Sequence, residues 1–143
     1  MVEANIVTPT KAQAEAVIRW LKNEHFNDLN GKKGFYCNRD AIRRAARESN
    51  MKCLTLGRSV IAFSVFGPAT IDIFEVHPNY RRKGYGRQFA GQLIQELFST
   101  SSPDISIECV PQESEHFWRA LGFVDQDERY QCWGTVMLVL RRP

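Results

Sequence analysis

Hydrophobic residues recur along the chain with two different spacings, and these spacings predict an alternation of strands and helices. Apolar positions that alternate or run together predict strands, whereas apolar positions three and four residues apart predict helices. The expected strands cover about residues 4–8, 51–56, 59–66, 69–76, 104–110 and 131–140, with a further short strand before the last. The expected helices cover about residues 10–23, 40–49, 85–98 and 112–121.

Local signals indicate where several of these elements begin and end. Thr8, Pro9 and Thr10 supply a cap and a first-turn proline for the first helix. Gly57 and Arg58 separate two apolar runs and predict a hairpin turn. Residues 23–38 are rich in turn-forming residues and have no period, so they predict a long loop. The buried faces of the first two helices are expected to comprise Ala14, Val17, Ile18 and Leu21, and Ala41, Ile42, Ala45 and Ala46.

A strand, a basic glycine turn and a helix follow one another between residues 71 and 98. The strand ends before Pro78, which cannot donate a hydrogen bond to a β ladder. The turn has the sequence RRKGYG at residues 81–86. Its glycines permit a positive φ and a close approach of the backbone to a ligand. The first amides of the following helix have no partners within the helix, so the turn favours an anion, and a phosphate-bearing ligand is the leading interpretation.

The turn lacks the spacing of two common phosphate-binding motifs. Phe89 stands where a dinucleotide-binding G-x-G-x-x-G needs its third glycine, and the chain has no G-x-x-x-x-G-K-[ST] run. What it has is R-x-x-G-x-G after a strand that ends in Val76, and this resembles the acyl-CoA-binding motif of the N-acetyltransferase (GNAT) superfamily. A second segment, FWRALGF at residues 117–123, resembles the F-Y-x-x-L-G-F that ends a helix in that family. The motifs cover about residues 60–128, and the rest of the chain resembles the family in element order only.

The resemblance implies a fold, an activity and a set of ligand-binding residues. The fold is an α/β (α+β) single domain over residues 1–143, with a mixed, mostly antiparallel sheet flanked by helices in the order β-α-α-β-β-β-α-β-α-β-β. Its fourth and fifth strands are expected to splay apart beneath the ligand. The activity is transfer of an acetyl group from acetyl-CoA, by direct attack, to a primary amine of a small molecule or peptide. The implied acetyl-CoA-binding residues are Phe74, Val76, Arg81, Arg82, Lys83, Gly84, Gly86 and Arg87.

Three carboxylates are candidates for taking a proton from the acceptor amine, a task that needs a reachable base of suitable pKa. Asp72 shares a strand face with Phe74 and Val76 if no bulge intervenes, and some family members have a carboxylate at the matching position. Glu75 points to the opposite face unless a bulge re-aims it. Glu108 resembles a strand glutamate that serves as the base in other members. The alternative for each is a salt bridge with one of the many arginines.

The chain departs from the family pattern at the group that would protonate the leaving thiolate. Trp118 stands where the family usually has a tyrosine, and an indole N–H cannot give up a proton. The thiolate is then protonated by water or by another group, for which the candidates are Tyr85, His116 and Tyr130. Trp118 itself is expected to pack in the core. Coenzyme A has a thiol pKa near that of free cysteine, about 8.5, so an acid is helpful rather than obligatory.

The resemblance leaves the acceptor open. The family's loop between the first two helices usually closes over the acceptor, and here residues 23–38 offer Glu24, His25 and Asp28 but also Lys32 and Lys33. In the next helix Arg39, Arg43 and Arg47 repeat every four residues, as either a solvated face or a basic strip. Such a strip would suit an aminoacyl-tRNA-acetylating, toxin-like enzyme, although a net charge of +3 makes nucleic acid an improbable partner. A catalytically silent CoA-binding regulatory module is the other alternative.

Composition sets the remaining bounds. A chain of 143 residues with 43% hydrophobic and 24% charged residues is typical of one globular domain. The N-terminus has no signal-peptide pattern and no run approaches a membrane span, so the cytoplasm is the expected compartment. The four cysteines have no metal-ligand spacing, so we expect no metal; Cys53, Cys109 and Cys132 are expected in the core and Cys37 in a loop. The apolar last strand could pair across a homodimer or lie inside the sheet.

Overall fold

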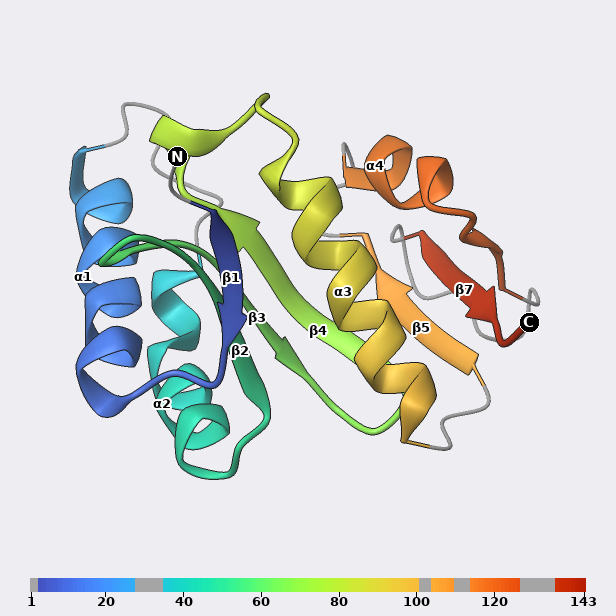
Figure 1. The fold of residues 1–143 in the computed structure, drawn as a ribbon, viewed down its shortest axis with the longest axis horizontal. Coiled ribbons are helices and arrows are strands. Elements are labelled where there is room, and N and C mark those ends of the chain that lie inside the picture. The colour runs from blue at the N-terminus through green and yellow to red at the C-terminus, as the bar shows by residue number, and fades with distance from the viewer. Residues whose placement is uncertain (1–2, 28–34, 101–103, 110–113, 127–135) are drawn as a thin grey trace.

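The structure is a computed structural model, and it describes residues 3–27, 35–100, 104–109, 114–126 and 136–143. The strands in these residues form one seven-stranded sheet in the order β1-β2-β3-β4-β5-β7-β6 (Figure 1). They are β1 (Ala4–Val7), β2 (Met51–Leu56), β3 (Ser59–Phe66), β4 (Thr70–Val76), β5 (Asp104–Glu108), β6 (Val124–Asp125) and β7 (Met137–Arg141). Every neighbouring pair is antiparallel except β4 and β5, which run parallel. The mixed, mostly antiparallel sheet predicted from the sequence is therefore confirmed.

Helices cover both faces of this sheet (Figure 1). The helices are α1 (Lys11–Asn27), α2 (Arg39–Arg47), α3 (Tyr85–Ser99) and α4 (Glu115–Ala120), with short 3-10 turns η1 (Tyr36–Asn38) and η2 (Pro78–Tyr80). One buried cluster joins α1 and α2 to β2, β3 and β4, whereas another joins α3 and α4 to β4, β5 and β7. Because the two clusters lie on opposite faces, β4 is covered by α1 on one side and by α3 on the other.

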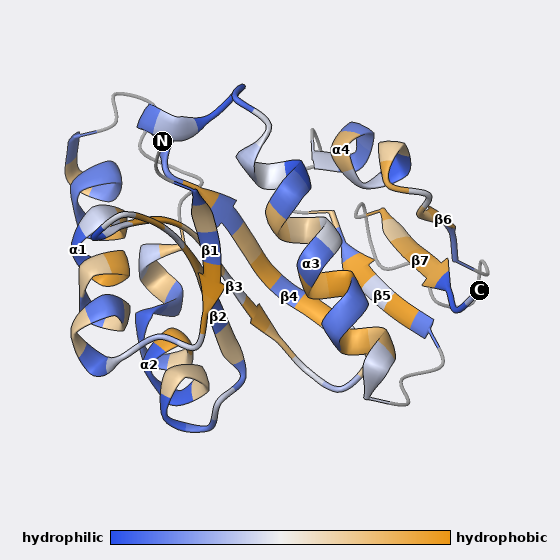
Figure 2. Cartoon of the chain, in the orientation of Figure 1, coloured by the Kyte–Doolittle hydropathy of each residue, from blue (hydrophilic) through white to orange (hydrophobic). Residues whose placement is uncertain are grey.

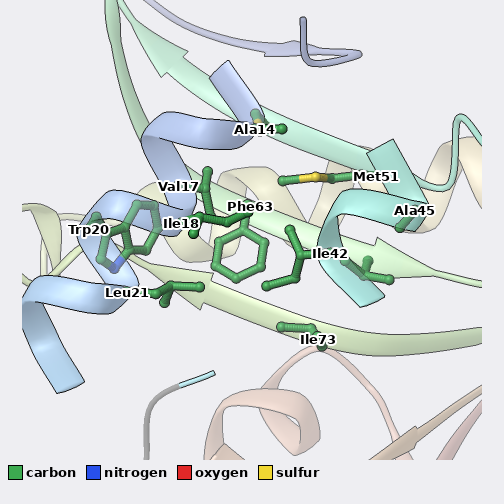
Figure 3. Packing of buried hydrophobic residues seen from close by; sticks show 12 residues of the cluster. Ala14, Val17, Ile18, Trp20, Leu21, Ile42, Ala45, Met51, Phe63 and Ile73 are labelled. Atoms are coloured by element: carbon green, nitrogen blue, oxygen red, sulfur yellow. The ribbon is translucent and has the colours of Figure 1, made fainter. Parts of the chain in front are cut away.

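Phe63 of β3 lies at the centre of the cluster beneath α1 and α2 (Figure 3). It is completely buried, and so are Leu21 from α1 and Ile42 from α2. The Trp20 ring meets Phe63 edge-on, with 5.3 Å between ring centroids. Each fully buried side chain of this size contributes about 1.5–3 kcal/mol, so this layer fixes α1 firmly against the sheet. Hydrophobic residues correspondingly concentrate on the strands, whereas the helices mix hydrophobic and hydrophilic residues (Figure 2).

The predicted order of elements is confirmed, but the boundaries of α1 differ from the prediction. Thr10 is the cap, not Thr8: its Oγ1 accepts from the Gln13 amide at 3.1 Å while the Gln13 side chain accepts from the Thr10 amide at 2.9 Å. Pro9 therefore precedes the cap. The helix continues to Asn27, so the first part of the predicted loop is helical and residues 28–34 lie outside the described residues. In α2, Ala41 is exposed rather than buried, because Ile42 and Ala45 carry the inward face.

Two predicted elements near the C-terminus are described only in part. Helix α4 spans Glu115–Ala120, and residues 110–113 of the predicted strand and helix lie outside the described residues. The last strand is described over Met137–Arg141, and residues 131–135 of its predicted range fall outside as well. Strand β7 lies between β5 and β6 in the sheet, and β6 pairs with its residues Leu138 and Val139. Within the described residues, no helix is both long and apolar enough to cross a membrane.

Strands β4 and β5 are paired over only a short distance. Their parallel ladder comprises Thr70 with Ser106 and Ile71 with Ile107, at the start of β4. Beyond this point β4 continues to Val76 beside β3 alone, while β5 pairs along its whole length with β7. The two strands therefore diverge, which confirms the splay expected from the sequence.

Candidate functional site

Helix α3 begins at the wide end of the gap between β4 and β5, directly after the basic turn. Gly84 is its cap residue and has a φ of 87°, a conformation that side-chain-bearing residues rarely adopt. The first bond of the helix joins the Gln88 amide to the Gly84 carbonyl at 3.1 Å, so the amides of residues 85–87 have no acceptor within the helix. The first turn carries no acidic residue, and a Cβ at Gly84 would meet no atom within 4 Å. This open, positively polarised helix end fits an anionic group such as a pyrophosphate.

Gly86 explains how α3 can start so close to the sheet. A Cβ at this position would lie 3.3 Å from Cγ2 of Val76 and 3.5 Å from Cε2 of Phe117. The missing side chain thus lets the first turn of α3 rest against both the end of β4 and α4. Gly84 and Gly86 consequently have separate roles: one sets the backbone conformation of the turn, and the other permits the close approach.

The four basic side chains of the turn differ in where they point. Arg82 and Arg87 are exposed, and among the described residues neither has an ion-pair partner. Lys83 lies over the Tyr80 ring, with its Nζ 5.9 Å from the ring centroid. Arg81 differs from the sequence-based expectation of a phosphate ligand, because its guanidinium folds back and donates to the Val76 carbonyl at 2.8 Å and to Glu75 Oε1 at 3.0 Å.

Aromatic rings line the α3 side of β4. Phe74 stacks on Phe89 of α3 with 5.3 Å between centroids, and it meets Trp118 of α4 edge-on at 5.1 Å. Phe117 lies 5.6 Å from the same ring. These contacts join α3, α4 and β4 into one wall. The edge of β4 that faces away from β3 is not paired with β5 beyond Ile71. The backbone amide and carbonyl of Phe74 and the amide of Val76 are therefore available to a ligand that lies in the gap, whereas the Val76 carbonyl accepts from Arg81.

Glu75 lies on the opposite face of β4, beneath α1, as the alternation of the strand predicts. It pairs in register with Phe63, and its side chain is only 11% exposed. Burial, and secondly the charge of nearby Glu24, raise the pKa of Glu75 to about 8, although the Arg81 guanidinium opposes the shift. Its Oε2 is buried and accepts no hydrogen bond from a donor among the described residues, and the Glu24 carboxyl lies within hydrogen-bonding reach of Glu75 when one of the two is protonated. A carboxyl that titrates near neutral pH and has one uncommitted oxygen is suited to proton transfer.

Asp72 and Glu108 lie instead at the narrow end of the gap, each directly after the last paired residue of its strand. The register between β3 and β4 skips Asp72, because Phe66 pairs with Ile71 and Val65 with Ile73. This bulge breaks the simple alternation that would place Asp72 on the face of Phe74 and Val76, and Asp72 is exposed. Glu108 is also exposed, and its neighbours Ile107 and Cys109 face α3, so Glu108 shares a sheet face with Glu75.

Comparison with known proteins identifies the type of fold to which this geometry belongs. The model of the acetyltransferase (GNAT) family matches residues 58–123, which span β3, β4, the basic turn, α3, β5 and α4. The chain carries the GNAT signature and the GNAT fold. No curated protein matches the chain.

Solved structures agree over nearly the full chain. The PaiA N-acetyltransferase of Thermoplasma acidophilum, solved with coenzyme A, superimposes with a TM-score of 0.75 at 10% identity and covers 98% of this chain and 99% of its own. YncA of Salmonella typhimurium, solved with acetyl-CoA, has a TM-score of 0.70 at 17% identity, covering 97% and 94%. The ribosomal-protein-S18-alanine N-acetyltransferase of Escherichia coli has a TM-score of 0.72 at 17% identity, also covering 97% and 94%. At these identities the likeness concerns the fold.

The GNAT position usually occupied by tyrosine is part of the core here. Trp118 is 4% exposed and its ring contacts Phe74, Phe117 and Phe123 edge-on, so it packs as expected. His116 is exposed on the outer side of α4, and Tyr85 packs at the start of α3 beside Tyr80. Tyr130, the third predicted candidate, lies outside the described residues. The buried indole has no proton to give to a thiolate.

The arginines of α2 are largely engaged with protein groups. Arg43 pairs with Glu15 of α1 at 3.1 Å, and Arg39 stacks over the Tyr36 ring at 4.6 Å. Of the strip formed by Arg39, Arg43 and Arg47, only Arg47 is exposed, which weakens the argument for a continuous RNA-binding surface. Cys53 and Cys109 are buried and free, as predicted, whereas Cys37 is exposed and Cys132 lies outside the described residues. No group of three metal-ligating side chains occurs in the described part of the chain.

Helix α1 contributes residues that the sequence reasoning missed. A cleft of about 520 Å³ opens between α1 and η2, and its lining includes Trp20, Asn23, Glu24 and His77. The sequence placed Glu24 in a loop, but it belongs to α1, one turn after Trp20. A helical spacing of four between these two residues was the available signal, and the misplaced helix end concealed it.

Proposed function

We propose that this protein is an acetyl-CoA-dependent N-acetyltransferase that acetylates a primary amine of a small molecule or peptide. The observation that carries the proposal is the gap between β4 and β5, which ends at the first turn of α3. No side chain caps this turn by a hydrogen bond, and it contains no acidic residue. Such a gap offers strand backbone to a pantetheine arm and helix amides to a pyrophosphate in one continuous path. The GNAT signature and the ligand-bound GNAT folds support the same assignment.

The residues present fit this donor. Backbone groups of Arg82, Lys83, Gly84, Gly86 and Arg87 would hold the pyrophosphate, and the exposed side chains of Arg82, Lys83 and Arg87 would add positive charge. The backbone of Phe74 and the amide of Val76 would pair with the pantetheine, while the Val76 carbonyl accepts from Arg81. Acetyl-CoA supplies the acetyl group as a thioester, and the acceptor amine attacks it directly.

We assign Glu75 as the first candidate for accepting the amine proton, because it is a buried carboxyl with an uncommitted oxygen and a pKa of about 8. Asp72 and Glu108, exposed at the narrow end of the gap, are the candidates for binding the ammonium form of the acceptor, or for taking its proton if Glu75 does not. Trp118 is buried and its indole cannot give up a proton, so the leaving thiolate is protonated by water or by Tyr85, His116 or Tyr130. The nitrogen thus gains the acetyl carbon and loses a proton, and the sulfur regains one.

The donor site is tested by replacing Gly84 with Asp and, as a matched control, with Asn. Both residues tolerate the positive φ comparably, so they differ mainly by one negative charge at the start of α3. Calorimetric titration with acetyl-CoA, coenzyme A and ATP should give saturable binding of the first two and much weaker binding of ATP. Gly84→Asp should lower acetyl-CoA affinity at least about 10-fold more than Gly84→Asn, a difference of about 1.4 kcal/mol. Equal affinities of the two variants would contradict the pyrophosphate assignment.

The acceptor side is tested by thiol release from acetyl-CoA in the presence of a panel of amines. Glu75→Gln, Asp72→Asn and Glu108→Gln should each leave acetyl-CoA affinity within about threefold of the wild-type value, because donor binding is assigned to backbone groups. Loss of a general base typically lowers turnover about 10²–10⁴-fold, and we expect this for Glu75→Gln. Acetyl-CoA binding without thiol release for any amine would instead support the regulatory module.

A further inference from the structure

Arg81 connects three parts of the molecule that are separate in the sequence. Its Nε donates to the Val76 carbonyl at 2.8 Å and its Nη2 donates to Glu75 Oε1 at 3.0 Å. The same Nη2 lies 4.0 Å from Oε2 of Glu24 in α1. The guanidinium edge formed by Nε and Nη2 therefore binds protein groups at the junction of β4, the basic turn and α1. This edge does not point toward the first turn of α3.

Glu24 is itself held in place. The Trp20 indole donates to Glu24 Oε1 at 2.5 Å, and Trp20 is 7% exposed. The Trp20 ring meets Phe63 at 5.3 Å and His77 at 5.1 Å, both edge-on. Because Trp20 is fixed by the core, the carboxylate one turn later is fixed beside Glu75, although the cleft along α1 keeps Glu24 accessible.

We infer that Arg81 and Glu24 are positioning residues for Glu75, and that the Arg81 side chain serves this network and not the pyrophosphate. Arg81 engages Oε1 of Glu75 and leaves Oε2, which is buried and accepts from no donor in the described part of the chain, as the oxygen that can exchange a proton. The consequence for catalysis rests on the proposed role of Glu75 as the proton acceptor. The arrangement of the three side chains does not depend on that role.

The two neighbours act on Glu75 in opposite directions. The negative charge of Glu24 favours the protonated form of Glu75, and the positive charge of Arg81 favours the ionised form. Among the described residues, the charged groups that act on Glu75 are Glu24 from α1 and Arg81 from the turn, and His77, which follows β4, interacts with both of them. Burial lowers the pKa of His77, and its Nδ1 accepts a hydrogen bond from the Asn79 amide, so His77 adds no positive charge at neutral pH. Removing Arg81 and removing Glu24 must therefore shift the titration of Glu75 in opposite senses.

The test follows the Glu75 carboxyl carbon by NMR across a pH titration of the 13C-glutamate-labelled protein, with Glu75→Gln identifying its signal. Arg81→Gln should move the midpoint upward and Glu24→Gln should move it downward, each by about 0.5 to 1 pH unit or more. Arg82→Gln is the matched control, because this neighbouring arginine is exposed and should not move the midpoint. For acetyl-CoA, Arg81→Gln should stay within about threefold of the wild-type affinity, whereas Arg82→Gln should bind more weakly.

The inference is overturned if Arg81→Gln leaves the Glu75 midpoint unchanged and weakens acetyl-CoA binding as much as Arg82→Gln does. If Arg81→Gln fails to fold, Glu24→Gln still tests the inference. Arg81→Lys retains the positive charge but loses the two-point contact, so it should shift the Glu75 midpoint less than Arg81→Gln does. In turnover, the acidic limb of the pH–rate profile should move with the NMR midpoint in both variants. If the NMR shifts appear while Glu75→Gln keeps full turnover, the positioning network stands and the proposed role of Glu75 as the base fails.

Discussion

Replacing Glu75 with Gln should make the protein more stable than the wild type at alkaline pH. Burial, reinforced by the charge of Glu24, raises the pKa of Glu75 from 4.5 to about 8 in the folded state. The folded state therefore holds this proton more tightly than the unfolded chain. The favourable contribution is fully present below about pH 4.5 and is lost as pH rises toward about 8, because the unfolded chain ionises first.

The size of the effect follows from the shift. Each pKa unit corresponds to 1.36 kcal/mol, so the wild type should lose up to about 1.4 kcal/mol of stability per pH unit over this window. The full shift corresponds to about 5 kcal/mol, and water penetration and local rearrangement around buried charges reduce this to about 2–5 kcal/mol. Gln has nearly the same shape as Glu and cannot ionise, so it avoids this cost while still offering an acceptor to Arg81.

Equilibrium denaturant unfolding at intervals between about pH 4.5 and 9 measures the difference. The free energy of unfolding of Glu75→Gln minus that of the wild type should rise with pH and level off above about pH 8. Glu108→Gln, which removes an exposed carboxylate instead of a buried one, is measured alongside as the matched substitution. Parallel pH–stability curves for Glu75→Gln and the wild type would show that Glu75 titrates as an ordinary carboxylate, and the argument from burial would be wrong.

Three further substitutions test the framework of the site. Gly86→Val should lower both the melting temperature and acetyl-CoA affinity, because its Cβ would already lie 3.3 Å from Val76; unchanged affinity in calorimetry would contradict the close-approach argument. Trp118→Ala should cost about 3–5 kcal/mol in denaturant unfolding, whereas His116→Ala, on the exposed side of α4, should cost less than about 0.5 kcal/mol. Thr10→Ala should cost about 0.5–2 kcal/mol, and a cost near zero would mean that its reciprocal bonds with Gln13 contribute nothing.

Local patterns in the sequence were sufficient for the elements and for the glycine turn that opens α3. The alternation of apolar residues predicted β2 and β3 over Met51–Leu56 and Ser59–Phe66. It also predicted the order of the helices and strands in the described residues, because periodicity depends only on neighbouring residues. Gly84 and Gly86 were also recognisable, since a turn that opens a helix needs residues without side chains at fixed positions. The resemblance to the GNAT family added the prediction that β4 and β5 splay apart.

The direction of individual side chains was decided by tertiary contacts. The bulge at Asp72 arises from how β4 pairs with β3, and no local pattern in residues 70–76 indicates it. In the sequence, Arg81 is one of several cations in a basic run. In the fold, its guanidinium donates hydrogen bonds to the buried carboxyl of Glu75 and to the carbonyl of Val76. Glu24 joins them only because the core holds Trp20 and carries α1 one turn further than predicted. Backbone conformation was thus determined by local sequence, whereas the electrostatic partners of each charge were set by residues that lie far apart in the chain and meet only after folding.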